Sequence, residues 1–248
     1  KAEAHFLAGE FLPAAEDYEK VAYQPVGTSA KENAADSGYA AIIAYQKHID
    51  LLGGDKSKKA KKKVTEYREV AVESMLRFSA KFDSDKRSPT VLTNAAEYLF
   101  GLNQYERAIE VAQNLVAAKN LDKTLMKTAY GIMAHSYFKL EDYANAKTSY
   151  INQRSLVKKD GEEYTQISER IAAAVFKNAE VIEQTSGKME AAAELLRIKQ
   201  LSPNSPIRVT AQYDATSLLM SIEKWPEAIV ELRELIALYP KHELAVEF

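Results

Sequence analysis

The sequence predicts an all-α protein, a solenoid in which antiparallel helix hairpins stack one on another. Glycine and proline are scarce, 9 and 7 in 248 residues, and they stand at intervals that suit long helices with short turns. Apolar residues recur at spacings of three and four, which is the period of one helix face. One pattern also recurs five times along the chain, and such self-similarity is typical of repeat architectures.

The repeated pattern marks a turn between two helices and the start of the second helix. Its copies begin at Gly9, Asn103, Glu141, Gly187 and Glu223. A bulky residue follows each turn, and an alanine stands three positions later on the same helical face. These pairs are Phe11 and Ala14, Tyr105 and Ala108, Tyr143 and Ala146, Met189 and Ala192, and Trp225 and Ala228. Recurring alanine predicts that two helix backbones approach closely there, while the bulky residue fills the adjacent space.

The helices expected from these patterns form successive hairpins. Their approximate units are 1–26, 30–86, 88–120, 122–158, 161–203 and 205–240, with the start of another at 241–248. Unit 30–86 is an oversized hairpin that turns at Gly53 and Gly54, with apolar stripes on both sides of the turn. Residues 55 to 82 as one helix would reach about 42 Å and would project beyond the neighbouring helices. The pattern predicts that the chain starts and ends inside helices, and we expect it to be a piece cut from a longer protein.

The repeated residues resemble the tetratricopeptide repeat family. Members carry a small residue and an aromatic on the first helix, then an aromatic, an alanine and a bulky residue on the second, sometimes closed by proline. Ala96 and Leu99, or Ala134 and Tyr137, stand at the first-helix positions, and Pro240 matches the closing proline. The resemblance covers about 90–118, 125–153, 171–200 and 208–240, and 2–22 in part. The resemblance implies a right-handed α-solenoid, a superhelix of this family's type, and its repeats resemble the irregular ones of bacterial members. The repeats are irregular because successive copies are more than about 34 residues apart.

The sequence contains no motif for several classes of function. The histidines His5, His48, His135 and His242 are scattered and form no metal-spaced pair, and the chain has no cysteine. A nucleophile elbow and a glycine-rich phosphate loop are both missing. We therefore predict that the protein is not an enzyme and uses no cofactor or metal. The net charge of −2 argues against nucleic acid as a partner, and no apolar run is long enough for a membrane span.

The run from Lys56 to Lys63 is the one marked charge cluster in the sequence. Its lysines could form a patch for phosphate, anionic lipid or an acidic partner; the residues concerned are Lys58, Lys59, Lys61, Lys62 and Lys63. The simpler interpretation, which we favour at this point, is a solvated helix face around Ala60 and Val64. Lysines in a first turn oppose the helix dipole, however, so something else could hold them there.

The concave face is the better prospect for binding. In stacked hairpins the first helix of each pair lines that face. Projecting the family pattern places these residues there: Thr93, Glu97, Phe100, Gly131, His135, Phe138, Lys139, Phe176, Lys177, Glu180, Tyr213, Asp214, Ser217 and Met220. Their mixed aromatic and polar character suits an extended peptide or a partner helix. Packing of Phe100, Phe138 and Met220 against a neighbouring helix is the alternative. The lysine- and asparagine-rich clamp by which some family members grip a carboxylate tail is absent, since Thr93, Glu97, Gly131 and His135 stand in its place.

These observations predict a non-enzymatic scaffold that binds other proteins in its groove. The segment ELIALYPKHELA resembles envelope-associated bacterial members of the family, which implies a role in envelope assembly and a periplasmic or envelope location, with the cytoplasm as the alternative. Two other functions stay open. One is an accessory segment that positions substrate for a larger enzyme, and the other is binding to an anionic surface through the Lys56–Lys63 run.

Overall fold

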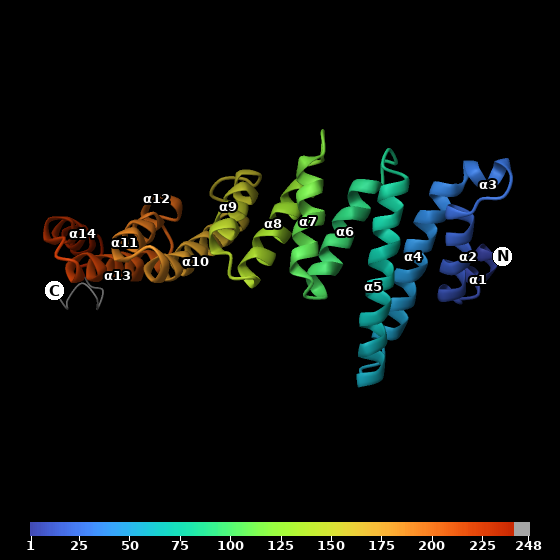
Figure 1. The fold of residues 1–248 in the computed structure, drawn as a ribbon, viewed down its shortest axis with the longest axis horizontal. Helices are drawn as coiled ribbons and strands as arrows, with labels where there is room; N and C mark the ends of the chain where they lie inside the picture. The colour runs from blue at the N-terminus through green and yellow to red at the C-terminus, as the bar shows by residue number, and fades with distance from the viewer. Residues whose placement is uncertain (241–248) are drawn as a thin grey trace. The chain divides into compact units, whose positions relative to one another are not determined.

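The computed structural model describes residues 1–240, which form α-helices joined by turns, with no strand among them (Figure 1). His242 and the predicted start of another unit at 241–248 lie outside the described residues. The chain divides into two compact units, Lys1–Ile132 and the part from Met133 onward, and the division falls within helix α8 (Lys123–Lys139). The all-α class is confirmed, while the prediction of one continuous solenoid stays a prediction.

The first unit is a series of helices in which each packs on the next. Its elements are α1 (Ala2–Leu7), α2 (Phe11–Tyr23), α3 (Thr28–Glu32), α4 (Ala34–Gly53), α5 (Lys58–Lys81), α6 (Ser88–Gly101) and α7 (Tyr105–Ala117). Helix α2 packs on α1 and α4, α5 on α4 and α6, and α6 on α7. This sequential packing is what a stack of antiparallel hairpins requires.

The second unit follows the same plan. After the end of α8 come α9 (Tyr143–Ser155), α10 (Glu162–Thr185), α11 (Lys188–Leu196), α12 (Ile198–Leu201), α13 (Ile207–Ser221) and α14 (Trp225–Leu238). Helix α10 packs on α9 and α11, and α13 packs on α11 and α14. The short α12 continues α11 after a break at Arg197, and it contacts α10 and α13.

The five repeated turns share one backbone feature. The first residue of each copy has a positive φ, and the angles are 77° at Gly9, 60° at Asn103, 61° at Glu141, 113° at Gly187 and 61° at Glu223. At Asn103 the backbone N–H donates to the carbonyl of Phe100 at 3.0 Å, and the next N–H donates to Leu99 at 2.9 Å. This pair of bonds is the Schellman helix end, and the turns at Glu141 and Glu223 repeat it.

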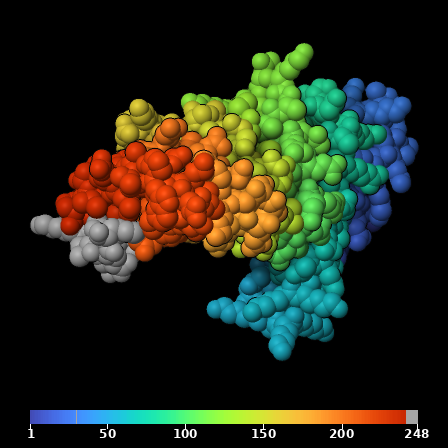
Figure 2. All heavy atoms as spheres, turned by 60° about the vertical axis from the view of Figure 1, so that its left-hand side comes forward, coloured from blue at the N-terminus to red at the C-terminus, as the bar shows by residue number. Residues whose placement is uncertain are grey.

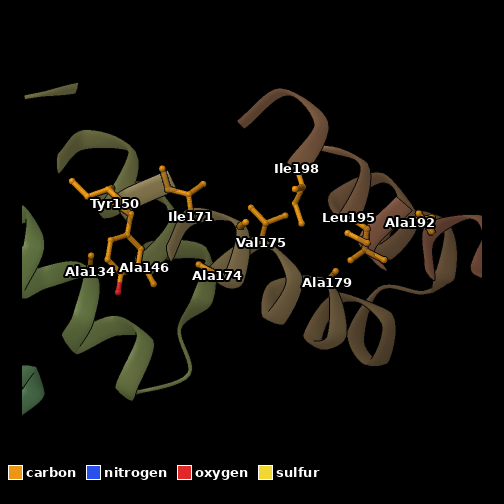
Figure 3. Close-up of a cluster of buried hydrophobic side chains, with 14 of the residues drawn as sticks. Ala134, Ala146, Tyr150, Ile171, Ala174, Val175, Ala179, Ala192, Leu195 and Ile198 are labelled. Carbon is orange, nitrogen blue, oxygen red and sulfur yellow. The ribbon is translucent and has the colours of Figure 1, made fainter. Parts of the chain in front are cut away.

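The recurring alanines lie where the helices approach most closely. All of them are buried, with exposed fractions of 0% at Ala14, Ala108 and Ala146, and 1% at Ala192 and Ala228. Figure 3 shows Ala146 of α9 near Ala134 of α8 and beside Tyr150 in the core of the second unit. The expectation that the bulky residues fill the adjacent space is wrong for Met189 and Trp225, which are 42% and 53% exposed. Alanine, not the bulky residue, is therefore the constant element of the packing.

A buried ion pair ties three helices of the second unit together. Lys147 of α9 donates to Glu194 of α11 at 2.5 Å, and Asn178 of α10 donates to the same carboxylate oxygen at 2.9 Å. Burial alone would raise the pKa of Glu194, but the hydrogen bonds from Lys147 and Asn178 lower it overall. The carboxylate is thus fully engaged within the fold.

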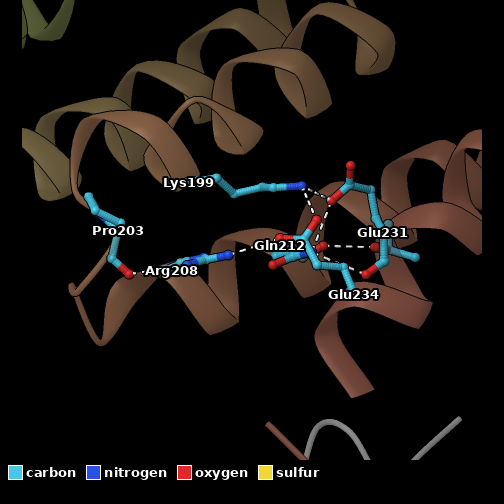
Figure 4. Close-up of polar contacts among 7 residues, drawn as sticks. Lys199, Pro203, Arg208, Gln212, Glu231 and Glu234 are labelled. Atoms are coloured by element: carbon cyan, nitrogen blue, oxygen red, sulfur yellow. Dashed lines mark hydrogen bonds and ion pairs between the residues drawn. The ribbon is translucent and has the colours of Figure 1, made fainter. Parts of the chain in front are cut away.

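A second polar network joins α12, α13 and α14 (Figure 4). Lys199 forms ion pairs with Glu231 and Glu234, and the distance to Glu231 is 2.8 Å. Arg208 donates to Glu234 at 2.9 Å, and Gln212 donates to the backbone carbonyl of Glu231 at 3.1 Å. These contacts are internal to the stack, so we assign them to the fold.

The oversized hairpin consists of α4 and α5. Its tip extends beyond the ends of α2 and α6 in Figure 1, as expected for so long a helix. The two helices approach closely at Gly38, where an added Cβ would lie 3.0 Å from the ring of Phe78 and 3.2 Å from that of Phe82. Glycine at this point lets the rings of Phe78 and Phe82 pack directly on the backbone of α4.

Candidate functional site

The predicted groove residues of α6 divide into buried and exposed positions. Thr93 is buried, and its hydroxyl donates to the carbonyl of Pro89 at 2.9 Å. Glu97 is exposed. Phe100 is half-buried, and its ring lies 5.5 Å from that of Tyr105, which begins the second helix of the same hairpin. Phe100 therefore packs across its own turn, and Thr93 offers no surface to a partner.

The groove residues on α8 show the same arrangement. The ring of Phe138 lies 5.1 Å from that of Tyr143, again across the turn of one hairpin. His135 hydrogen-bonds through Nδ1 to the hydroxyl of Tyr150 at 2.8 Å, and burial lowers its pKa. Lys139 is exposed. The aromatic residues of this helix thus contribute to the hairpin packing.

The groove residues of α10 and α13 come together around a pocket in the second unit. The pocket has a volume of about 390 Å³. Its lining residues are Phe176, Ala179, Glu180 and Glu183 of α10, Leu195 of α11, and Asp214, Ser217 and Leu218 of α13. Of these, Phe176, Glu180, Asp214 and Ser217 are positions at which the sequence predicts binding. We call this cavity the α10–α13 pocket.

Charge in the α10–α13 pocket is acidic and only partly compensated. Burial raises the pKa of Asp214, and the nearby carboxylate of Glu180 raises it further. Glu180 accepts a hydrogen bond from Lys177 at 2.7 Å, between side chains that are both about half exposed. Glu183 is exposed on the same helix. An apolar lining with three carboxylates matches a cationic side chain that has an aliphatic stem.

The remaining predicted residues lie against the core. Tyr213 packs on Val209 and Leu235, next to α14, and Met220 packs on the main core of the second unit. Sequence reasoning missed Ala179, Glu183, Leu195 and Leu218 as pocket residues. For two of them the signal was present, because Glu183 follows Glu180 by three positions and Leu218 follows Asp214 by four.

The lysines of the predicted anion patch are all exposed at the start of α5. The helix begins after Ser57, whose hydroxyl accepts the backbone N–H of Ala60 at 3.2 Å. Ala60 itself is buried, 6% exposed, so the lysines occupy the remainder of the helix surface. The structure thus presents the patch at the end of the oversized hairpin.

Residues 1–240 contain no group of three or more His, Asp or Glu side chains that could hold a metal ion. Within the same range, no helix has both the length and the apolar character that crossing a bilayer requires.

Comparison with known proteins gives structural similarity without a sequence match. No family model matches the chain, and neither does any curated protein. Pseudomonas aeruginosa pilF is 16% identical, with a TM-score of 0.42 over 100% of this chain and 92% of that one. The C-terminal part of a TPR repeat-containing protein from Cytophaga hutchinsonii is 13% identical, with a TM-score of 0.40 over 99% and 97%. TPR-like repeats of a Podosopora anserina kinesin light chain are 16% identical, with a TM-score of 0.43 over 79% and 94%. The fold assignment depends on the helix pairing described above and not on these similarities.

Proposed function

We propose that this stack of tetratricopeptide-type hairpins is a protein-interaction scaffold and that its partner binds in the α10–α13 pocket. The observation that carries the proposal is the pocket itself, which collects first-helix positions from two consecutive hairpins. Phe176 and Leu218 supply apolar contact, while Asp214 supplies uncompensated negative charge. Binding clefts in general combine an apolar lining with a few polar groups that fix orientation.

The chemistry of the pocket favours a basic segment as the partner. The aliphatic stem of a lysine or arginine would lie over the apolar lining, and its charged head would face Asp214 and Glu180. A cation at this position would relieve the repulsion between the two carboxylates, so binding would lower the raised pKa of Asp214. An acidic segment would instead add further negative charge to a partly buried site that already holds three carboxylates.

Fluorescence offers a direct test because the chain has no cysteine. A single Ser217→Cys substitution places an environment-sensitive dye in the pocket, and Ser155→Cys on the exposed end of α9 is the matched control. Two probes are titrated, a helical peptide of lysine and leucine and its counterpart of glutamate and leucine. We expect only the lysine peptide to bind, with a signal at Ser217 and none at Ser155.

The second part of the test removes the charge. Asp214→Asn should lower the affinity for the lysine peptide by roughly tenfold or more, as expected for loss of one partner in a partly desolvated charge pair. Glu190→Gln, an exposed change on α11, should leave affinity unchanged. Equal binding of both peptides, or an unaltered affinity of Asp214→Asn, would refute the assignment of the pocket.

The cellular role is the finer part of the proposal. Envelope assembly and a periplasmic or envelope location are supported by the resemblance of the ELIALYPKHELA segment, and the cytoplasm is the alternative. Osmotic-shock fractionation of the producing cells tests this, and recovery in the cytoplasmic fraction would contradict it. The accessory role in a larger enzyme stays a prediction, and a catalytic domain joined to this chain in the full-length protein would establish it.

A further inference from the structure

The end of the oversized hairpin concentrates positive charge. We define the basic tip as residues 50–63, which include the last turn of α4, the connecting turn and the first turns of α5. It holds 6 lysines, of which Lys56 is the first and Lys63 the last, and 2 aspartates, Asp50 and Asp55. The tip therefore has a net charge of +4, whereas the whole chain has −2.

The lysines of the basic tip are held by the fold but are not neutralised by it. Asp55 accepts the backbone N–H of Ser57 at 2.8 Å, and Ser57 caps α5, so the helix begins in an ordered way despite the unfavourable dipole. Among residues 1–240, the ion pair found for the run joins Lys62 to Glu66 at 3.8 Å, with side chains 81% and 56% exposed. An ion pair this exposed contributes little to stability, so the positive charge of the lysines stays available to an external partner.

Position and shape point to a flat partner. The tip extends past α2 and α6 in Figure 1, and it stands out from the first unit in the space-filling view of Figure 2. Its lysines surround α5 on every side except that of the buried Ala60. Leu51 is 61% exposed on the last turn of α4, so an apolar side chain accompanies the charges. A protruding end of this kind can meet a surface without obstruction by α2 or α6.

The composition of the tip favours lipid over nucleic acid. The segment DLLGGDKSKKAKKK has neither arginine nor an aromatic residue, the types that read phosphates bidentately or stack on bases. Lysine ammonium groups on flexible stems suit a fluid layer of headgroup phosphates, and basic clusters of this size on amphipathic helices bind anionic lipid. We propose that the basic tip docks this chain on an anionic lipid surface, with its lysines on headgroup phosphates and Leu51 at the acyl boundary.

Vesicle co-sedimentation tests the proposal with the whole chain. The probes are vesicles of phosphatidylcholine alone and vesicles of phosphatidylcholine with about one third phosphatidylserine. We expect binding to the anionic vesicles only, lost when salt is raised from about 0.1 to 0.5 M, because screening shortens the reach of the charges. Each lysine is expected to add roughly fivefold to partitioning. Replacing Lys58, Lys59, Lys61, Lys62 and Lys63 by Gln should therefore reduce partitioning by roughly a thousandfold or more.

Two controls separate this site from general charge and from the pocket. The first changes an equal number of exposed lysines elsewhere to Gln, namely Lys119, Lys123, Lys158, Lys159 and Lys224. It should retain most of the binding, as should Asp214→Asn, since the proposal does not depend on the α10–α13 pocket. Leu51→Ser should weaken binding and leave its salt dependence in place. Circular dichroism melting should be alike for both lysine sets, because every one of these side chains is exposed.

The proposal would be overturned by absence of binding to anionic vesicles, by an equal loss in both lysine sets, or by equal binding to vesicles with and without phosphatidylserine. Binding of single-stranded RNA or heparin without binding to vesicles would also overturn it, and would assign the tip to a soluble polyanion instead.

Discussion

The packing role of the recurring alanines can be tested by enlarging one of them. Ala146 on α9 is 0% exposed and lies in the same core cluster as Ala134, Tyr150 and Ile171. Leucine at this position adds three carbon atoms where helices meet, and overpacking of a core costs about 1–3 kcal/mol. Helix propensity barely changes from alanine to leucine, so steric overlap accounts for nearly all of the loss. At about 2–4 °C per kcal/mol, the melting temperature should fall by about 2–12 °C.

Ala144→Leu is the matched control, since Ala144 lies on the same helix and is exposed. A surface change of this kind should stay within about 0.5 kcal/mol of the parent chain. Urea unfolding followed by circular dichroism measures both variants, together with thermal melting. If the two leucine variants unfold at the same urea concentration, then alanine does not set the helix spacing and the reasoning about the repeat is wrong.

Three further measurements address the turns, the aromatic pairs and the buried acid. Glu223→Gly should stabilise the protein by about 0.5–1 kcal/mol because glycine tolerates the φ of 61°. Glu227→Gly inside α14 should destabilise it by a similar amount, and the urea midpoints of the two variants test the difference. Phe100→Ala should cost about 1–3 kcal/mol and leave peptide binding unchanged, and loss of binding without loss of stability would contradict its packing role. The lowered pKa of Glu194 means that its contribution is complete above its ordinary value of 4.5 and is lost as pH falls through the lower folded value. The parent chain should therefore lose more stability than Glu194→Gln between about pH 5 and pH 3, and parallel pH profiles would contradict the role of the ion pair.

The features that sequence predicted well are those set by neighbours along the chain. The spacing of Ala108 from the turn at Asn103 places the alanine in the first turn of the helix that follows, and the structure buries this alanine and gives Asn103 a positive φ. The long α4–α5 hairpin was predictable for the same reason, since two apolar stripes meet at one glycine pair. Local period and turn chemistry are sufficient for such elements.

The features that the sequence could not predict depend on residues that are far apart along the chain and meet only when the helices stack. Lys147 and Glu194 are 47 residues apart, and no local pattern pairs them. From its position Phe100 fits either the groove or packing, and only the structure shows that its ring lies beside that of Tyr105 across the turn. The α10–α13 pocket likewise needs two helices from different hairpins at a fixed spacing, so sequence supplied some of its residues but not the cavity.

Two acids of the second unit show how a structural group differs from one that we propose binds a partner. Glu194 is buried, but Lys147 and Asn178 engage its carboxylate, and its pKa is lowered. Asp214 is half-buried, the part of the chain that the structure describes provides its carboxylate with no hydrogen bond or ion pair, and its pKa is raised. A raised folded pKa means that ionised Asp214 destabilises the fold, by an amount that grows as pH rises from its ordinary value of 3.8 through the folded value.

Asp214→Asn should therefore match the parent chain in stability near pH 3 and exceed it near pH 7. The same substitution should lower the affinity for the lysine peptide. Urea unfolding at the two pH values, with the peptide titration beside it, measures both effects. A group that costs stability in the free protein and supplies affinity in the complex is what a binding site requires. If Asp214→Asn instead destabilises the chain at neutral pH, the carboxylate has a partner within the fold, and the argument that it awaits a cation fails.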